Sequence, residues 1–426
     1  TLFPYTTLFR SNNMYEMEQI DERVILVGID TGNEDAANRS LDELSELAKT
    51  AKAAVVGRLI QPRESAHPGT YIGKGKLTEL KDLIWETDAT GIICDDELTS
   101  AQLGNLEEEL SCKIIDRTLL ILDIFAARAV SGEGKIQVEL AQLRYRASRL
   151  AGLGRSLSRL GGGIGTRGPG EKKLEMDRRL IRERISRLKK ELKDVEKHRE
   201  LIRTQRKQSG LKVAALVGYT SAGKSSIENV LTNAGILEDA MLFSTLDTTT
   251  RSLVLDNTQE ILVTDTVGFI RKLPHHLVEA FKSTLEEAKY ADIIIHVVDA
   301  SNPQMDEQMH VVYDTLRQLG AADRPVITLF NKQDKLESAG SYRDFQAEYS
   351  IPASAKTGEG LAELKKALLE IVRREQIYVE RLYDFSEASK IQLIRSRGQL
   401  LSEKYVPEGI EVKAYVPKDI YGKVCI

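Results

Sequence analysis

A glycine-rich loop supplies the first chemistry in this sequence. Residues 218–225 read Gly-Tyr-Thr-Ser-Ala-Gly-Lys-Ser, after the apolar run 213–217 and before a segment of helical pattern. Glycines allow the tight turn in which backbone N–H groups converge on phosphates, and the helix start adds the positive end of its dipole. The lysine can reach the β and γ phosphates, and the last serine hydroxyl can bind Mg²⁺. The loop predicts a triphosphate site made by Gly218, Tyr219, Thr220, Ser221, Ala222, Gly223, Lys224, Ser225 and Ser226.

A second motif indicates which base is bound. Asn331, Lys332 and Asp334 follow the apolar run 326–330. A carboxylate only accepts hydrogen bonds, so Asp334 can take two from the N–H and amine of guanine, whereas adenine presents the wrong groups. Asn331 and the Lys332 stem would support the base. A loop of Ser354, Ala355 and Lys356 could close over it.

Two segments between these motifs are suited to the γ-phosphate and its metal. Asp265 ends the apolar run 261–263, where a strand-end carboxylate can hold Mg²⁺ through water and the Gly268 N–H can contact the phosphate. A threonine-rich segment, 243–251, is typical of chain that orders around the phosphate. Its hydroxyls leave the metal-binding threonine open among Thr245, Thr248, Thr249 and Thr250. The predicted nucleotide contacts here are Phe243, Ser244, Thr245, Leu246, Asp247, Asp265, Thr266, Val267 and Gly268.

The residue after Gly268 is Phe269. A phenyl ring can neither orient an attacking water nor accept its proton. Lys224, Mg²⁺ and the loop N–H groups can still stabilise the transition state. We therefore expect slow intrinsic hydrolysis that a macromolecular partner accelerates.

Charge is distributed unevenly along the 426 residues. Residues 142–210 hold 21 lysines and arginines against 8 acidic residues, a surplus of 13, although the whole chain has a net charge of −4. A basic block in an otherwise acidic protein favours binding to a polyanion. Apolar residues at helical spacing over 136–150 and 181–195 predict an antiparallel helical hairpin. The joining segment, 151–170, is rich in glycine and arginine.

The remaining patterns predict an α/β chain of several domains. Short apolar runs at 24–29, 54–60, 91–94 and 113–115 alternate with helical stretches, which predicts a small parallel α/β domain. Alternating residues at 377–382 and 410–416, around a helix expected at 386–404, predict a small α+β module. The predicted divisions are 1–20 as a tail outside the domains, 21–130, the basic hairpin 131–210, the nucleotide domain 211–375 with a mostly parallel sheet, and 376–426.

Taken in order, these motifs resemble the HflX family of ribosome-associated GTPases. The resemblance covers about residues 21–375 and includes motifs at 71–76, 115–118, 121–125, 137–142 and 161–171. It implies that Thr245 is the metal-binding threonine, with Thr250 as second choice. The sequence departs from the family pattern in ways that leave the phosphate and base contacts in place: Ser221 replaces a usual asparagine, Glu228 a usual apolar residue, Thr248 a proline, Leu119 a glycine and Lys172 a threonine.

The resemblance also implies a partner. Family members insert the hairpin tip into the large ribosomal subunit, so it implies contact with rRNA near the peptidyl transferase region, GTP-dependent binding, and splitting of stalled or idle 70S ribosomes under stress. The implied RNA-binding residues are Arg155, Arg159, Arg167, Lys172 and Lys173. Two alternatives stay open: a GTPase that acts in subunit assembly or on another RNA, and a GTP-dependent switch that binds a protein without RNA.

Composition predicts where such a protein works. Three cysteines show neither a disulfide framework nor metal spacing, and no signal peptide or run of 18 apolar residues occurs. We expect a cytoplasmic monomer without a membrane span.

Overall fold

The computed structural model describes residues 22–160, 169–232, 242–243, 245, 248–256, 259–272, 282–336 and 342–425. Within these ranges the side chains of 151–160, 169–174, 207–209 and 282–284 are not described. Among the predicted nucleotide contacts, Ser244, Leu246 and Asp247 lie outside the described residues. Of the predicted RNA contacts, Arg167 lies outside them, as do the side chains of Arg155, Arg159, Lys172 and Lys173.

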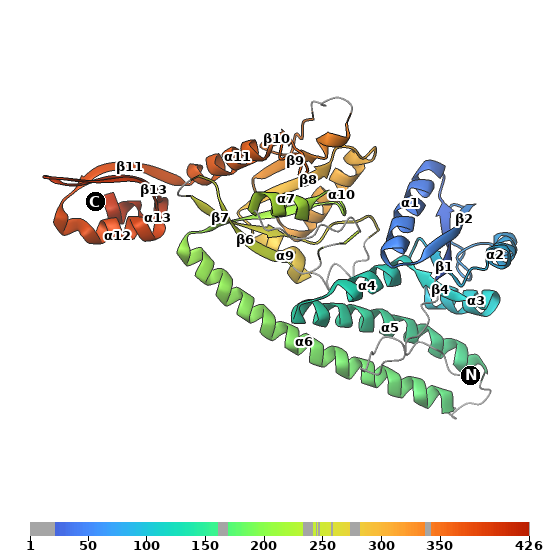
Figure 1. Ribbon diagram of the computed structural model, residues 1–426. Helices are drawn as coiled ribbons and strands as arrows, with labels where there is room; N and C mark the ends of the chain where they lie inside the picture. Colours follow the sequence, from blue (N-terminus) through green and yellow to red (C-terminus); the bar gives the residue numbers. More distant parts are fainter. Residues whose placement is uncertain are drawn as a thin grey trace, which may run out of the picture.

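The N-terminal domain is a four-stranded parallel sheet in the order β2-β1-β3-β4 (Figure 1). Its elements are β1 (Arg23–Asp30), α1 (Glu34–Thr50), β2 (Ala54–Pro62), α2 (Lys74–Thr87), β3 (Gly91–Cys94), α3 (Ser100–Leu110), β4 (Lys113–Asp116) and α4 (Arg117–Arg128). The Asn33 side chain caps α1 by accepting the Ala36 N–H. Leu41, Leu44 and Leu47 repeat at helical spacing and are fully buried against the sheet. The predicted parallel α/β domain is confirmed.

Two long helices form the predicted antiparallel hairpin, α5 (Gly132–Leu160) and α6 (Pro169–Ser209). Figure 1 shows α6 lying along α5 and continuing to the start of the next domain. The two helices have different roles. Val138, Ala141 and Tyr145 of α5 belong to the same buried cluster as α1 and α4, so α5 is part of the N-terminal core. On α6, Leu188 is buried while Arg182, Arg187 and most other basic side chains are exposed.

The nucleotide domain contains a six-stranded sheet in the order β10-β9-β8-β5-β7-β6, parallel except for the β6–β7 pair. Its elements are β5 (Lys212–Gly218), α7 (Lys224–Thr232), β6 (Thr249–Val254), β7 (Glu260–Asp265), α9 (Lys282–Tyr290), β8 (Ile293–Asp299), α10 (Met305–Leu319), β9 (Val326–Asn331), η1 (Gln333–Lys335), β10 (Tyr349–Pro352) and α11 (Leu361–Arg374). Two buried clusters cover the two faces of this sheet. β5, β7, β8 and β9 end at one edge, which is where parallel α/β sheets bind ligands.

Below that edge lies a buried histidine, His296 of β8, which is 1% exposed. Its ring meets that of Tyr313 edge to face at 5.1 Å. Burial lowers the pKa of His296 from its ordinary 6.5 to about 4, with Asp344 opposing and Lys224 adding to the shift. Protonation of His296 is therefore less favourable in the folded protein than in the unfolded chain.

We expect this histidine to weaken the fold in mild acid. Its folded pKa lies below its unfolded pKa, so the unfolded state binds the proton more tightly and the free energy of unfolding falls as the pH drops from 6.5 towards 4. The shift corresponds to a loss of about 3 kcal/mol. Urea unfolding of the chain and of His296→Phe across this range measures it. Equal pH slopes in the two proteins would contradict the expectation.

The C-terminal module is an antiparallel sheet in the order β11-β13-β12, with helices packed on one face. Its elements are β11 (Gln376–Tyr383), η2 (Phe385–Glu387), α12 (Ala388–Arg397), β12 (Gln399–Val406), β13 (Gly409–Pro417) and α13 (Lys418–Cys425). The helix expected over 386–404 ends at Arg397, and 399–406 form an edge strand paired with β13. Gly398 ends the helix at a place where a Cβ would lie 2.9 Å from the carbonyl oxygens of Ile394 and Tyr415. Within the described ranges, no helix is long and apolar enough to cross a membrane.

Candidate functional site: a nucleotide site in contact with the N-terminal domain

The glycine-rich loop connects β5 to α7 as predicted. Gly223 has φ +97°, and a Cβ there would lie 2.3 Å from the Asn331 side-chain nitrogen, so only glycine fits. The Lys224 amine is buried and donates to the carbonyl oxygens of Gly218 (3.2 Å) and Tyr219 (3.0 Å). Burial lowers the pKa of Lys224 to about 8, against the opposing effect of Asp265. The Lys224 amine and the backbone N–H groups of the loop are together suited to binding an anion.

Three side chains whose oxygen atoms could bind a metal ion meet next to the loop. The hydroxyls of Ser225 and Thr245 lie 2.8 Å apart and donate to Asp265 Oδ2 at 2.7 and 2.9 Å. Burial raises the pKa of Asp265, while Lys224 and the two hydroxyls oppose the rise. Asp265 Oδ1 is buried and has no hydrogen-bond partner among the described residues. Mg²⁺ takes oxygen ligands, often only one or two carboxylates besides phosphate, so this set could hold it.

The structure also distinguishes among the candidate threonines. Thr245 is placed beside Ser225 and Asp265. Thr250, the second choice, instead contacts the Thr264 hydroxyl across β6 and β7 at 3.0 Å. Thr249 donates to Glu228 at 2.8 Å. This geometry favours Thr245 as the metal-binding threonine.

The base motif and the phosphate loop are connected by Asn331. Its side chain donates to the Ala222 carbonyl oxygen at 2.8 Å and accepts the Ala355 N–H at 3.0 Å. Lys332 donates to the Ser221 carbonyl oxygen at 2.7 Å. The Asp334 carboxylate is exposed and accepts the Ser354 hydroxyl at 2.7 Å, which holds the pKa of Asp334 below its usual value. Asp334 is therefore ionised and acceptor-only at neutral pH, as guanine recognition requires.

The segment after Asp265 is joined to the phosphate loop by its backbone. Thr220 donates its N–H to the Phe269 carbonyl oxygen at 2.8 Å, and Phe269 donates to that of Gly218 at 3.1 Å. The Phe269 ring is 2% exposed and packs in the core with Leu285 and Ala288. A phenyl ring has no group that could orient or deprotonate water.

Gly268 provides a direct test of this close packing. A Cβ there would lie 2.9 Å from the Thr220 Cα and 3.0 Å from Lys224 Nζ. An added methyl group would displace Lys224 and the loop, and a misplacement on the order of 1 Å can cost about a hundredfold in rate, so we expect Gly268→Ala to lower kcat/KM for GTP about thirtyfold. The control is Gly104→Ala on α3, where an added Cβ meets nothing within 4 Å. Steady-state turnover that is equal in both variants would show that the packing at Gly268 is unimportant.

Comparison with known proteins agrees with this geometry. Three family descriptions match in succession: a GTP-binding GTPase N-terminal region over 38–126, a GTP-binding GTPase middle region over 128–206, and a 50S ribosome-binding GTPase over 213–332. The chain is 62% identical to GTPase HflX of Lacrimispora saccharolytica, over 96% of this chain and 97% of that one. The chain belongs to the HflX family of GTPases. The resemblance inferred from the motifs is confirmed, and with it GTP as substrate.

Other HflX proteins match over similar lengths. GTPase HflX of Caldanaerobacter subterraneus subsp. tengcongensis is 50% identical, over 97% of this chain and 96% of its own. That of Escherichia coli K12 is 38% identical, over 95% and 93%. A solved structure of SsGBP in complex with GDP is 25% identical and covers 83% of this chain and 99% of its own, with a TM-score of 0.47.

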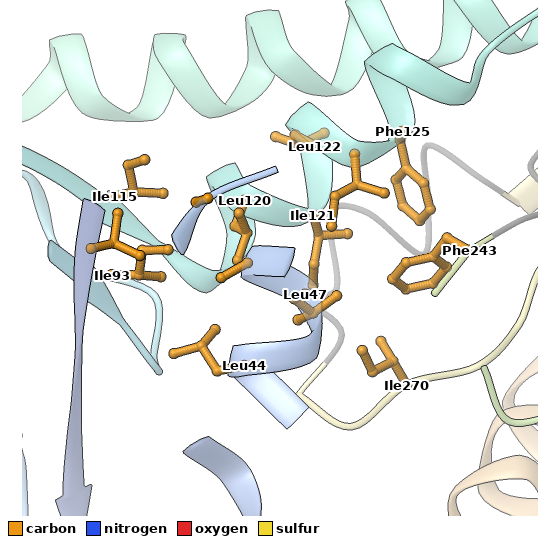
Figure 2. Close-up of a cluster of buried hydrophobic side chains, with 14 of the residues drawn as sticks. Leu44, Leu47, Ile93, Ile115, Leu120, Ile121, Leu122, Phe125, Phe243 and Ile270 are labelled. Atoms are coloured by element: carbon orange, nitrogen blue, oxygen red, sulfur yellow. The ribbon is translucent and has the colours of Figure 1, made fainter. Parts of the chain in front are cut away.

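In this HflX GTPase the candidate nucleotide site also touches the N-terminal domain. Figure 2 shows Phe243 and Ile270 next to the apolar side chains of α1 and α4. The rings of Phe125 and Phe243 meet edge to face, with centroids 4.7 Å apart. Val267 belongs to the same buried cluster. Segment 243–251 and the chain after Asp265 are the two segments expected to respond to the γ-phosphate. Residues from both thus pack into the core of the N-terminal domain.

A polar network crosses the same interface. Arg117 of α4 is 1% exposed and donates to Asp95 at 2.9 Å, to Glu43, and to the Arg271 carbonyl oxygen at 3.3 Å. The Tyr219 hydroxyl donates to Glu43 and accepts the Arg271 N–H at 2.9 Å. Tyr219 therefore belongs to both the phosphate loop and the domain interface.

Ion pairs extend this network towards solvent. Lys272 pairs with Asp95 and, at 2.8 Å, with Asp96. Arg39 of α1 reaches Glu307 of α10 at 3.4 Å. Sequence reasoning missed these residues because they lie far apart in the chain. The one available signal was acidic residues at the ends of parallel strands, where ligands and neighbouring domains meet.

Proposed function

We propose that this GTPase binds the large ribosomal subunit when loaded with GTP and splits stalled or idle 70S ribosomes. The matching description of residues 213–332 as a 50S ribosome-binding GTPase supports this partner. The basic surplus over 142–210 supports contact with RNA, since lysine and arginine neutralise phosphates and release counterions. The rRNA contacts proposed are Arg155, Arg159, Arg167, Lys172 and Lys173, near the peptidyl transferase region.

One observation carries the proposed coupling to GTP. α5 is packed into the N-terminal core, and that same core contacts Tyr219, Phe243, Val267 and Ile270 of the nucleotide domain. A γ-phosphate that reorders those segments changes the surface on which the N-terminal domain rests. The hairpin would move with that domain, because α5 is part of it. Hydrolysis would then release the protein from the ribosome.

The metal and the chemistry are part of the same proposal. Ser225 and Thr245 would hold Mg²⁺ directly, with Asp265 acting through water, and the ion would neutralise charge on the β and γ phosphates. Lys224 stabilises the developing charge, and the Gly268 N–H contacts the γ-phosphate. Because Phe269 is committed to the core, the water-positioning group comes from elsewhere, which agrees with stimulation by the ribosome.

Sedimentation with purified ribosomes tests the splitting activity. We expect the chain with GTP to convert 70S particles into subunits and, with a non-hydrolysable analogue, to co-sediment with the large subunit. Binding only to a precursor particle or to another RNA would indicate the assembly function instead. Failure to bind any RNA would indicate a switch that acts on proteins.

The hairpin tip supplies a prediction of its own. Replacing Arg155, Arg159 and Arg167 by alanine removes three phosphate-binding charges, so large-subunit affinity should fall at least about tenfold and its salt dependence should flatten. The matched control removes three exposed arginines elsewhere, Arg58, Arg317 and Arg374. Filter binding at several salt concentrations measures both. Equal affinity in the two triple variants would rule out the tip as the contact.

A further inference from the structure

A buried carboxylate, Glu228 of α7, lies one helical turn after Ser225. It is 2% exposed, although its neighbours Ile227 and Leu231 are core residues. Its Oε1 has no hydrogen-bond partner among the described residues. Burial raises the pKa of Glu228 to about 7. An apolar side chain would avoid the cost of burying a carboxylate here, so its contacts need an explanation.

Those contacts join three parts of the nucleotide site. The carboxylate accepts the Thr249 hydroxyl at 2.8 Å and a hydrogen bond from the backbone of Asp265. Thr249 and Asp265 are partners in the β6–β7 register. The backbone oxygen of Glu228 accepts the Thr232 hydroxyl at 2.7 Å. Through its side chain, Glu228 thus connects α7 to Asp265 and to Thr249, four residues after Thr245, whereas the contact with Thr232 uses only the Glu228 backbone.

We propose that Glu228 is a positioning residue for GTP hydrolysis, which fixes Thr249 at the start of β6 against Asp265 so that the Thr245 hydroxyl stays beside Ser225 and Asp265. Glu228 does not touch the substrate. It acts through Thr249, which lies four residues after Thr245. It also acts through the backbone of Asp265, whose carboxylate accepts the hydroxyls of Ser225 and Thr245. This inference rests on the proposed Mg²⁺ role of Thr245 and Asp265.

The local charges agree with a positioning role. Arg251 Nε lies 3.6 Å from Glu228 Oε2, beyond hydrogen-bond distance, so the Thr249 hydroxyl at 2.8 Å is the closer polar partner of the carboxylate. A glutamine at 228 keeps an acceptor oxygen for Thr249 and for the Asp265 backbone. A leucine removes both contacts and fits the apolar surroundings. The two substitutions therefore separate the hydrogen bonds from the packing.

The test measures turnover by the full chain as a function of GTP and Mg²⁺. For Glu228→Leu we expect kcat to fall about tenfold and the Mg²⁺ concentration for half-maximal turnover to rise severalfold, with GDP affinity changed less than about twofold. Glu228→Gln should retain most of the turnover. Thr249→Val should reproduce the loss, and Glu228→Leu combined with Thr249→Val should be no worse than either alone. Melting temperatures confirm that each variant folds.

Two results would overturn the inference. One is unchanged kcat and Mg²⁺ dependence in Glu228→Leu, and the other is additive losses in the double variant. Thr245→Ala separates this failure from failure of the metal proposal. If Thr245→Ala alters the Mg²⁺ dependence while Glu228→Leu does not, only the positioning role is lost. If neither does, the metal assignment of Thr245 fails too.

Discussion

Replacing Arg117 by alanine should destabilise the N-terminal domain by about 3 kcal/mol, since Glu43 would lose its cation and the buried Asp95 would keep only Lys272 as a cationic partner. It should also loosen the contact with Arg271. Differential scanning calorimetry should show an earlier transition for the N-terminal part of the chain. GTP binding should then stabilise that part less than it does in the unchanged protein.

The matched control is Arg58→Ala. Arg58 pairs with Asp42 at 2.6 Å, but the two side chains are 41% and 62% exposed, so this pair contributes at most about 1 kcal/mol. If both variants melted alike, Arg117 would contribute no more to the free energy of unfolding than the exposed Arg58 does. The polar network at the interface would then contribute little to stability. Tyr219→Phe offers a milder change, because it removes only the hydroxyl that joins Glu43 to Arg271.

Replacing Asp334 by asparagine should change base preference. The carboxylate would lose two charge-assisted hydrogen bonds to guanine, worth about 3 kcal/mol together, so GTP affinity should fall about a hundredfold. The amide N–H₂ can instead donate to the 2-carbonyl of xanthine, so affinity for xanthosine triphosphate should rise. Ser354 remains able to donate to the side-chain oxygen, so the loop stays in place.

Competition of GTP, ATP and xanthosine triphosphate against a fluorescent nucleotide measures this change. Asp323→Asn is the control, because Asp323 is exposed and precedes β9 at the opposite end from the base motif. Unaltered GTP affinity in Asp334→Asn would mean that the base is read by some other group. That outcome would also remove the main reason for choosing guanine over adenine.

The meeting of the motifs at one edge of the sheet could be predicted because each motif is local in sequence. Each motif follows a short apolar strand, and the ends of parallel strands meet at one edge of the sheet. Gly218, Asp265 and Asn331 therefore come together once β5, β7 and β9 pair in parallel order. The roles assigned to individual side chains, including Thr245 and Lys224, stay proposals that the variants above test.

The interface between domains could not be predicted, because it depends on contacts between distant residues. Arg117 stands 154 positions before Arg271, and Glu43 stands 176 before Tyr219. Nothing in the local pattern around Arg117 separates a buried arginine from an exposed one at a helix start. The C-terminal error has a local cause: a helical pattern continues past Gly398, while pairing with β13 makes 399–406 a strand.

The most direct test of the account is the affinity for purified large subunit with a non-hydrolysable GTP analogue and with GDP. We expect the analogue form to bind at least about tenfold more tightly, a coupling of about 1.4 kcal/mol. In the combined variant Tyr219→Phe and Lys272→Met, which removes polar contacts across the interface and leaves the apolar ones, this ratio should decrease. Equal affinity with either nucleotide in the unchanged protein would contradict the claim that the nucleotide site controls the hairpin.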